Sequence, residues 1–131
     1  MSVPGDLFES ALKARERAYA PYSGFRVGAA VRDESGRITG GCNVENASYG
    51  LSNCAERTAL FRLVAEGGAK VVEMAVVADG DGVVSPCGAC RQVIMELAPE
   101  AVLWLCHVDG RSERRTPAEL LPEAFRFSRP S

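Results

Sequence analysis

Two cysteine motifs, placed where helices are expected to begin, constrain this chain more than any other feature. The first reads CAE at residues 54–56 and the second reads PCGAC at residues 86–90. In the second motif, Ser85 suits the N-cap and the following proline suits the first helical position, so both cysteines should lie in one helical turn, on one face. Ser52 or Asn53 is expected to cap the helix of the first motif. The two helix starts are therefore predicted to direct their cysteines to one point.

Three thiolates and one carboxylate at such a point have a specific chemical use. Helix N-termini favour the thiolate form of cysteine, which is the form that binds metal. Cys54, Cys87 and Cys90 can hold a zinc ion and leave its fourth position to water, as catalytic zinc sites do. Glu56 is then expected to move protons to and from that water. Because three thiolates leave a divalent cation with net negative charge, Arg57 is predicted to offset that charge by donating to ligand sulfurs.

Two simpler interpretations of the cysteines stay open on these motifs alone. A Cys-x-x-Cys pair that opens a helix could be a redox pair, although the third cysteine and the neighbouring glutamate argue against it. A closed structural zinc site would need a fourth protein ligand, and His107 and Cys42 are the candidates, but neither has the paired spacing of zinc fingers or ribbons. His107 ends an apolar run and is expected to be a satisfied or surface histidine.

The two motifs together resemble the zinc signature of the cytidine deaminase superfamily. The resemblance is carried by CAE at residues 54–56 and PCGACRQ at residues 86–92, and a cysteine as first ligand is similar to the small homotetrameric cytidine deaminases. It extends to PYSGFRVGAA at residues 21–30, which resembles the family's first-strand segment. GCNVENASYG at residues 41–50 resembles its ribose-binding segment. The resemblance covers residues 19–125, which is most of the chain.

This resemblance implies an enzyme that uses Zn²⁺ and hydrolytically deaminates cytidine and 2'-deoxycytidine to uridine and 2'-deoxyuridine, with release of ammonia, in pyrimidine salvage. It also implies a nucleoside as the small-molecule partner and a homotetramer whose sites are shared between subunits. The substrate-binding residues implied are Phe25 against the pyrimidine ring, Asn43 and Glu45 on the ribose hydroxyls, Ala55, and Tyr49 and Phe125, which would reach into a neighbouring subunit's site.

Without the resemblance, several of these positions have simpler interpretations. Asn43 and Glu45 point to the same side of an extended segment and could grip adjacent hydroxyls of one sugar, but they could equally be a solvated strand end closed by a turn. Phe25, at a strand start, would more often be a core residue than a stacking platform. Phe125 could merely pin the C-terminal segment.

The alternation of helical and strand patterns predicts an α/β fold, and the resemblance specifies a three-layer α/β/α sandwich with a mixed five-stranded sheet. Asp6 and Glu9 are expected to form a capping box for a first helix that ends before Pro21. Strand, helix and strand between residues 71 and 107 predict a parallel pair. Both cysteine helices should begin past the carboxyl ends of strands, where open α/β sheets place ligands. The predicted strands are 26–32, 37–43, 71–78, 102–107 and about 111–115, and the later helices are 54–66, 86–97 and a short one opened by Thr116.

Length and composition limit the architecture and the partners. At 131 residues with 47% hydrophobic residues, the chain can build one core, so a single domain over residues 1–131 is predicted. With a net charge of -2, the chain has no positive electrostatic potential that would attract polyanions, so no nucleic acid partner is expected. With no signal-like or membrane-spanning apolar run, no membrane partner is expected either. An odd number of cysteines at metal-like spacing fits a reducing cytoplasm.

Two rival functions follow from the same residues. A deaminase of the same build could act on a cytosine-containing antibiotic such as blasticidin S, which would not need the ribose-binding pair. A zinc module that only binds partners would need neither Glu56 nor an open metal position, so the substitution Glu56→Gln should leave it undisturbed.

Overall fold

The computed structural model describes residues 2–127, and its five strands form one sheet in the order β2-β1-β3-β4-β5. Every predicted strand and helix is present, with shifts at the ends. The strands are β1 (Val27–Asp33), β2 (Ile38–Cys42), β3 (Val71–Ala78), β4 (Val102–His107) and β5 (Ser112–Arg115). The α-helices are α1 (Gly5–Arg15), α2 (Ala55–Ala65), α3 (Gly88–Leu97) and α4 (Pro117–Leu120), with a 3-10 helix (Tyr49–Leu51) before α2.

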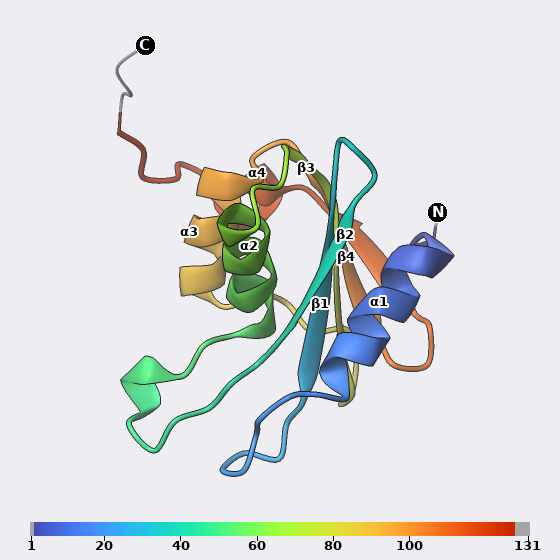
Figure 1. Cartoon of the computed structure of the whole chain (residues 1–131), viewed down its shortest axis with the longest axis vertical. Helices are drawn as coiled ribbons and strands as arrows, with labels where there is room; N and C mark the ends of the chain where they lie inside the picture. The colour runs from blue at the N-terminus through green and yellow to red at the C-terminus, as the bar shows by residue number, and fades with distance from the viewer. Residues whose placement is uncertain (1, 128–131) are drawn as a thin grey trace.

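Helices cover both faces of the sheet, so the molecule has three layers (Figure 1). α1 packs on one face, where Leu7 shares a buried cluster with Val77. α2 and α3 pack on the other face, where Leu60 shares a second cluster with Val76. Successive residues of β3 therefore contribute to opposite cores, which explains why this strand is apolar at every position except Glu73. The predicted α/β/α sandwich with a mixed sheet is confirmed. Within residues 2–127, no helix combines the length and the apolar character needed to cross a membrane.

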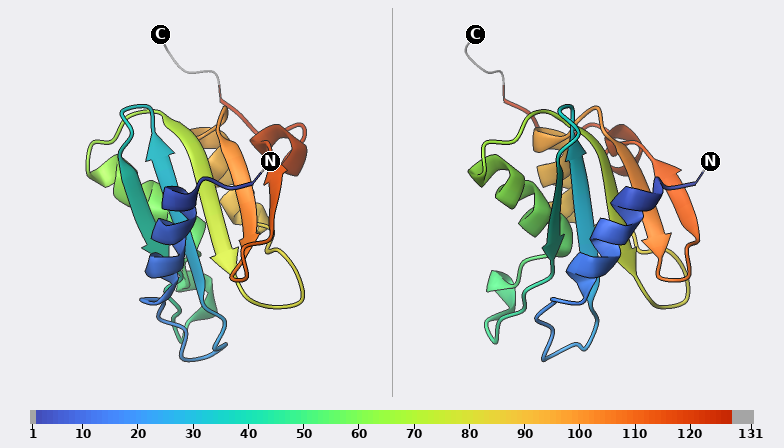
Figure 2. Two further views of the ribbon diagram at one scale, coloured as in Figure 1. Left: turned by 90° about the vertical axis from the view of Figure 1, so that its right-hand side faces the viewer. Right: turned by 45° about the vertical axis from the view of Figure 1, so that its right-hand side comes forward.

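The strand directions place the two cysteine helices at the same end of the sheet. β1 pairs antiparallel with both β2 and β3, so β2 and β3 run in the same direction and end at the same edge. The predicted parallel pair is β3 with β4, and β5 returns antiparallel to β4. α2 follows β2 and α3 follows β3 along the chain, so both helices start near those strand ends (Figure 2).

The helix starts differ from the predicted ones. Cys54 itself is the N-cap of α2, and Cys87 is the N-cap of α3, so neither Ser52 nor Ser85 caps a helix. α1 has Pro4 at its N-cap and begins at Gly5, so the expected capping box does not form; the Asp6 carboxylate accepts from the next residue's N–H instead. Asn53 does not cap α2 either, and Pro86 lies before α3 instead of at its first helical position, because the backbone is still extended at each N-cap cysteine.

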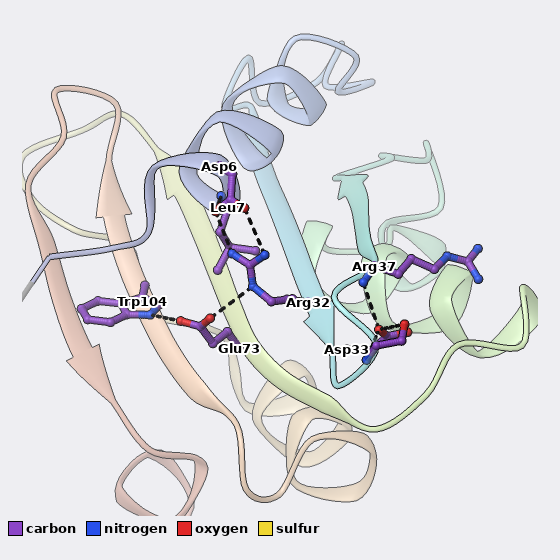
Figure 3. A network of polar contacts seen from close by, with 8 residues as sticks. Asp6, Leu7, Arg32, Asp33, Arg37, Glu73 and Trp104 are labelled. Atoms are coloured by element: carbon purple, nitrogen blue, oxygen red, sulfur yellow. Dashed lines mark hydrogen bonds and ion pairs between the residues drawn. The ribbon is translucent and has the colours of Figure 1, made fainter.

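Figure 3 shows a polar network that joins α1 to three strands. Arg32 on β1 donates to both carboxylate oxygens of Asp6, at 3.1 and 2.7 Å. Its Nε also donates to Glu73 on β3 at 3.2 Å. Glu73 in turn accepts from the indole Nε1 of Trp104 on β4 at 3.2 Å. The network gives each partly buried charge a partner and fixes α1 against the sheet.

Asp33 closes the hairpin between β1 and β2 and is 1% exposed (Figure 3). Its carboxylate accepts from the backbone N–H groups of Ser35, Arg37 and Ala69 and from the Ser35 hydroxyl. The Ser35 hydroxyl first, and then the Ala69 N–H, hold the pKa of Asp33 below its usual value. One side chain thereby ties the hairpin turn to the segment that enters β3.

Candidate active site

Three cysteine sulfurs meet where α2 and α3 begin. The Sγ atoms of Cys54, Cys87 and Cys90 all lie within 4.8 Å of one another, and those of Cys54 and Cys87 are 3.8 Å apart. Two sulfurs that bind one tetrahedral zinc ion at about 2.3 Å each are separated by about 3.8 Å. Cys90 is fully buried, whereas Cys54 is half-buried and Cys87 is exposed. The predicted convergence of the two helix starts is confirmed, and the donor set and spacing fit Zn²⁺.

The electrostatics of the cluster favour a bound cation. A hydrogen bond from Cys90, followed by one from Arg57, lowers the pKa of Cys54 to about 5. The pKa of Cys90 is raised, first because its thiol donates to Cys54 and then because it is buried. The protein alone therefore stabilises one thiolate here at the expense of its neighbour. A divalent cation among the sulfurs would remove this conflict, because it favours deprotonation of every ligand thiol.

Glu56 lies in the first turn of α2 and is 4% exposed. Burial is the main cause that raises the pKa of its carboxyl group, and the nearby Cys54 adds to that effect. Buried carboxyl groups are rare in proteins unless they are paired or take part in chemistry. Glu56 is therefore placed and poised to hold or release a proton close to the cysteines.

Arg57 donates to the cluster, as the sequence predicted. Its Nη2 is 3.4 Å from the Sγ atom of Cys54, and its pKa is raised, first by this contact. Its Nε is buried and has no hydrogen-bond partner within residues 2–127. The guanidinium thus places a positive charge against the sulfur of Cys54 while one of its buried donors stays unpaired.

A cavity of about 260 Å³ opens onto the cysteine cluster. Four residues predicted to bind substrate line it: Phe25, Asn43, Glu45 and Ala55. Cys54, Cys87 and Glu56 line it as well, so two of the three clustered cysteines and the buried carboxyl group share one cavity with these side chains. Among the described residues that line the cavity, the acidic side chains are Glu45 and Glu56, and no basic side chain is present.

Asn43 and Glu45 both hold the segment that carries Phe25. Asn43 accepts from the N–H of Val27 and donates to the carbonyl of Phe25, each at 2.8 Å. Glu45 accepts from the N–H groups of Tyr22 and Ser23, at 3.0 and 3.1 Å, and from the Ser23 hydroxyl. The hydroxyl contact is the first cause that lowers the pKa of Glu45. The two side chains thus lie on the same side, as predicted, and they fix the wall that Phe25 belongs to.

A close helix–strand approach positions α2. A Cβ atom added to Gly41 on β2 would lie 2.4 Å from the backbone N of Ala59 on α2. Only glycine fits there, because real Cβ contacts do not come that close. Its neighbour Gly40 leaves more room, with a distance of 3.4 Å to Ala14 Cβ. Gly41 therefore lets α2, and with it Cys54 and Glu56, lie directly on the sheet, whereas Gly40 faces α1.

Comparison with known proteins identifies the family. The family model described as the cytidine and deoxycytidylate deaminase zinc-binding region matches residues 1–106. The cytidine deaminase of Halalkalibacterium halodurans is 53% identical over 120 residues, covering 91% of this chain and 91% of that protein. The chain belongs to the cytidine and deoxycytidylate deaminase family.

Other members of the family agree in sequence and in structure. The cytidine deaminase of Mycobacterium tuberculosis is 44% identical over 117 residues, covering 88% of this chain and 84% of that protein. The crystal structure of cytidine deaminase from Burkholderia pseudomallei matches with a TM-score of 0.91 at 49% identity, covering 94% of this chain and 99% of that one. The family match rests on a zinc-binding region, which agrees with the three-sulfur cluster.

Two residues that the family resemblance assigns to the site lie outside the cavity in this chain. Tyr49 is 77% exposed in the 3-10 helix, and its ring meets Tyr22 edge-on with centroids 6.3 Å apart. Phe125 is 65% exposed after α4 and packs edge-on against Phe127 at 4.9 Å. Neither is among the described residues that line the cavity. Their assigned role across a subunit boundary stays a prediction.

The structure also answers the open questions about the other cysteines and His107. Across residues 2–127, the group that could hold a metal consists of the three predicted cysteines, and it includes neither His107 nor Cys42. His107 bonds through Nε2 to the Gly80 carbonyl at 3.0 Å and accepts at Nδ1 from Asp109. It is a satisfied histidine, as expected. The five cysteines are all free.

Sequence reasoning missed two serines of the cavity wall. Ser23 donates to Glu45 and accepts from the N–H of Phe25 at 3.0 Å, and Ser85 lines the cavity beside Cys87. Ser23 precedes a glycine in a turn, and this pattern alone is weak evidence for a place in a binding site. Ser85 precedes a proline, and this pattern predicts a helix N-cap and not a cavity residue. Their roles depend on contacts with segments distant in sequence, which no local pattern reports.

Proposed function

We propose that the protein is a zinc-dependent cytidine deaminase that converts cytidine and 2'-deoxycytidine to uridine and 2'-deoxyuridine and releases ammonia, as a step of pyrimidine salvage. One observation carries the proposal: the buried carboxyl group of Glu56 lines the same cavity as the sulfurs of Cys54 and Cys87. Hydrolytic removal of a ring amino group needs a proton carrier beside an activated water, and this arrangement supplies both. Membership of the deaminase family supports the same assignment.

Cys54, Cys87 and Cys90 are the zinc ligands in this proposal. The sulfurs of Cys54 and Cys87 have the spacing of two thiolates on one tetrahedral ion, and the sulfur of Cys90 lies within 4.8 Å of both. Three protein ligands leave the fourth position to water. Zinc held there supplies a water molecule activated for attack on C4 of the cytosine ring. Arg57 stabilises the Cys54 thiolate and draws negative charge from the cluster, which keeps the ion a useful acid.

Glu56 moves the protons of the reaction. Its carboxylate takes one proton from the attacking water and delivers it to N3 of the ring. After the C4–O bond has formed, Glu56 carries the remaining hydroxyl proton to the amino group, which leaves as ammonia while C4 becomes a carbonyl. Burial raises the pKa of Glu56, which brings the carboxyl closer to the range where it can both accept and donate near neutral pH.

The cavity is better suited to a nucleoside than to a nucleotide. Phe25 and Ala55 offer apolar surface for the ring, and Asn43 and Glu45 stand where sugar hydroxyls could bond. Among its described lining residues there is no lysine or arginine, whereas Glu45 and Glu56 are acidic. A phosphate group would meet repulsion rather than a counter-charge. Neither nucleic acid nor a membrane is proposed as a partner.

We also propose a cytoplasmic homotetramer in which residues 1–131 act as one domain. Large apolar side chains left exposed on one chain support burial by other subunits. These side chains include Tyr49, Leu51, Phe61, Val64 and Phe125. Tyr49 and Phe125 are proposed to complete a neighbouring subunit's site. The free cysteines fit a reducing compartment.

The two rival functions have less support. The relatives described above are named cytidine deaminases, and they give no support to an antibiotic as the substrate. A zinc module that only binds partners would have no use for a buried carboxyl beside the metal cluster.

A single assay tests the proposal. Zinc-loaded protein is mixed with cytidine, 2'-deoxycytidine, CMP or blasticidin S, and deamination is followed by ultraviolet absorbance. The variants are Glu56→Gln and, as a control, Glu9→Gln, an exposed residue of α1. We expect turnover of both nucleosides, loss of at least about 100-fold in Glu56→Gln with zinc retained, and full activity in the control. Equal activity of Glu56→Gln and wild type would contradict the proposal.

A further inference from the structure

Arg91 follows Cys90 on α3, and its guanidinium makes three short hydrogen bonds. Nε donates to the carbonyl of Pro86, Nη1 to the carbonyl of Leu120, and Nη2 to the hydroxyl of Ser85, each at 2.8 Å. None of the acceptors is a cysteine sulfur. Arg91 therefore has a different task from Arg57, although each follows a motif residue directly.

The acceptors belong to two segments that are distant in sequence. Ser85 and Pro86 immediately precede Cys87, and Ser85 and Cys87 both line the cavity. Leu120 is the last residue of α4, so its carbonyl has no partner further along that helix. One side chain thus joins the loop that delivers Cys87 to the C-terminal part of the chain.

Cys87 depends on that loop more than Cys90 does, because Cys90 lies inside α3. Cys87 is the exposed member of the cluster, and it is the N-cap residue of α3 with extended backbone rather than a residue inside the helix. Cys90, by contrast, is buried within the first turn of α3. The place of the Cys87 sulfur therefore depends on how firmly residues 85 and 86 are held.

Other residues of α3 hold the chain beyond α4. Nε2 of Gln92 donates to the carbonyl of Phe125 at 3.1 Å, and Arg126 contacts the sulfur of Met95 at 3.1 Å. These contacts fix the segment that carries Phe125 but do not touch the loop before Cys87. They provide a natural control, because Gln92 supports the C-terminal segment alone, whereas Arg91 supports that segment and the loop together.

We propose that Arg91 is a positioning residue for the metal site: it clamps the Ser85–Pro86 loop to the end of α4 and so holds Cys87 in place to retain zinc. The planar guanidinium presents several donors in a fixed fork, and a lysine, which is a point charge on a flexible chain, cannot bond all three acceptors at once. The proposal rests on the assignment of Cys87 as a zinc ligand. It adds that the C-terminal segment is part of the structural support of the metal centre.

The test measures zinc release rather than catalysis. Zinc-loaded protein is mixed with a chromophoric chelator, and the rate of release is followed for wild type, Arg91→Ala, Arg91→Lys, Ser85→Ala and Gln92→Ala. We expect release about tenfold or more faster in Arg91→Ala, because partners that orient metal ligands typically change affinity by about 10–100-fold. Arg91→Lys should recover only part of the loss, Ser85→Ala should show a smaller increase, and Gln92→Ala should match wild type.

A double variant decides whether the contact itself matters. If Ser85 acts through Arg91, then Ser85→Ala should add little to the release rate of Arg91→Ala, in which the contact is already absent. Additive effects would contradict the proposal, as would an unchanged release rate in folded Arg91→Ala or an equal acceleration in Gln92→Ala. If Arg91→Ala does not fold, the zinc-release rates of Arg91→Lys and Ser85→Ala test the proposal in its place, and wild-type rates in both would contradict it.

Turnover of cytidine, measured in parallel, keeps the proposal separate from the proposed function. A change in zinc release in protein that deaminates nothing would support the role of Arg91 and contradict the deaminase assignment. If the protein deaminates cytidine but Arg91→Ala and Arg91→Lys release zinc at the wild-type rate, the deaminase assignment would be supported and the role of Arg91 would be contradicted.

Discussion

The guanidinium of Arg57 lies against the sulfur of Cys54, with Nη2 and Sγ 3.4 Å apart. Both residues belong to the start of α2, so the donor and the sulfur are held in register by one helical turn. Glu56 lies between them in sequence and lines the cavity. The start of α2 therefore brings a predicted metal ligand, a predicted proton carrier and a compensating cation together within four residues, 54–57.

Removing the cation should weaken the site. In Arg57→Ala, the Cys54 thiolate loses its donor, and we expect zinc affinity or kcat to fall by about 10–100-fold. Arg57→Lys should restore part of the loss, because it returns the charge without the forked geometry. Arg62→Ala, one turn further along α2 and exposed, is the control. Zinc retention by chelator competition and steady-state rates test this; unchanged values in Arg57→Ala would exclude the role.

Glu45 should affect substrate affinity more than the rate of the chemical step. In Glu45→Gln an amide nitrogen replaces the carboxylate oxygen that accepts from the Ser23 hydroxyl, and an amide nitrogen cannot accept that hydrogen bond. The substitution also removes the negative charge that would strengthen a hydrogen bond from a sugar hydroxyl. We expect KM for cytidine to rise about tenfold or more, with kcat changed by less than about threefold, because hydrogen bonds to charged groups are worth about 1.5–3 kcal/mol. Ser23→Ala should raise KM less. A normal KM in Glu45→Gln would contradict the ribose-binding role.

Shared sites can be tested by mixing two defective variants. Glu56→Gln lacks the proton carrier, and Phe125→Ala lacks an aromatic ring that is 65% exposed on the single chain. If Phe125 completes a neighbouring site, hybrid tetramers should contain some sites with both groups intact and should recover activity after subunit exchange. Sedimentation of wild type should report a tetramer. A fully active monomer, or no recovery in proven hybrids, would argue against shared sites.

Gly41→Ala should destabilise the protein and loosen the metal site together. Its new Cβ would lie 2.4 Å from the backbone of Ala59, so α2 would have to move away from the sheet. We expect the free energy of unfolding in urea to fall by about 1–3 kcal/mol, as for overpacked cores, and zinc release to accelerate. Gly40→Ala, whose Cβ would meet Ala14 at 3.4 Å, should change little. Equal effects of the two substitutions would refute this account.

Asp33 should make stability depend on pH in the acid range. Its folded pKa is lowered, so its stabilising effect is fully present above the unfolded value of about 3.9 and is lost as the pH falls through the lower folded pKa. Asp33→Asn should therefore lower the melting temperature at pH 7, and the difference from wild type should shrink below about pH 4. Thermal melts over pH 3–7 test this. A difference that does not depend on pH would show that the charge is irrelevant.

Much of the fold and the metal centre followed from local patterns. Strand and helix positions came from the spacing of apolar residues, and the cysteines could be placed at helix starts because caps and prolines act over a few residues. The exact caps were missed, since extended backbone at Cys54 and Cys87 depends on the segments before them. The capping box expected at Asp6 does not form because α1 begins at Gly5, which places Asp6 inside the helix.

The sequence by itself determined the chemistry of the centre: three thiolates, a carboxylate and an arginine at two helix starts, which is a property of residue type and short spacing. Only the tertiary structure decided how these groups are held. Burial of Glu56, the hydrogen bonds of Asn43 and Glu45 to the Phe25 segment, and the hydrogen bond from Arg91 to Leu120 all depend on residues far apart in the chain. Such contacts arise when strands pair and helices pack, so no local pattern encodes them.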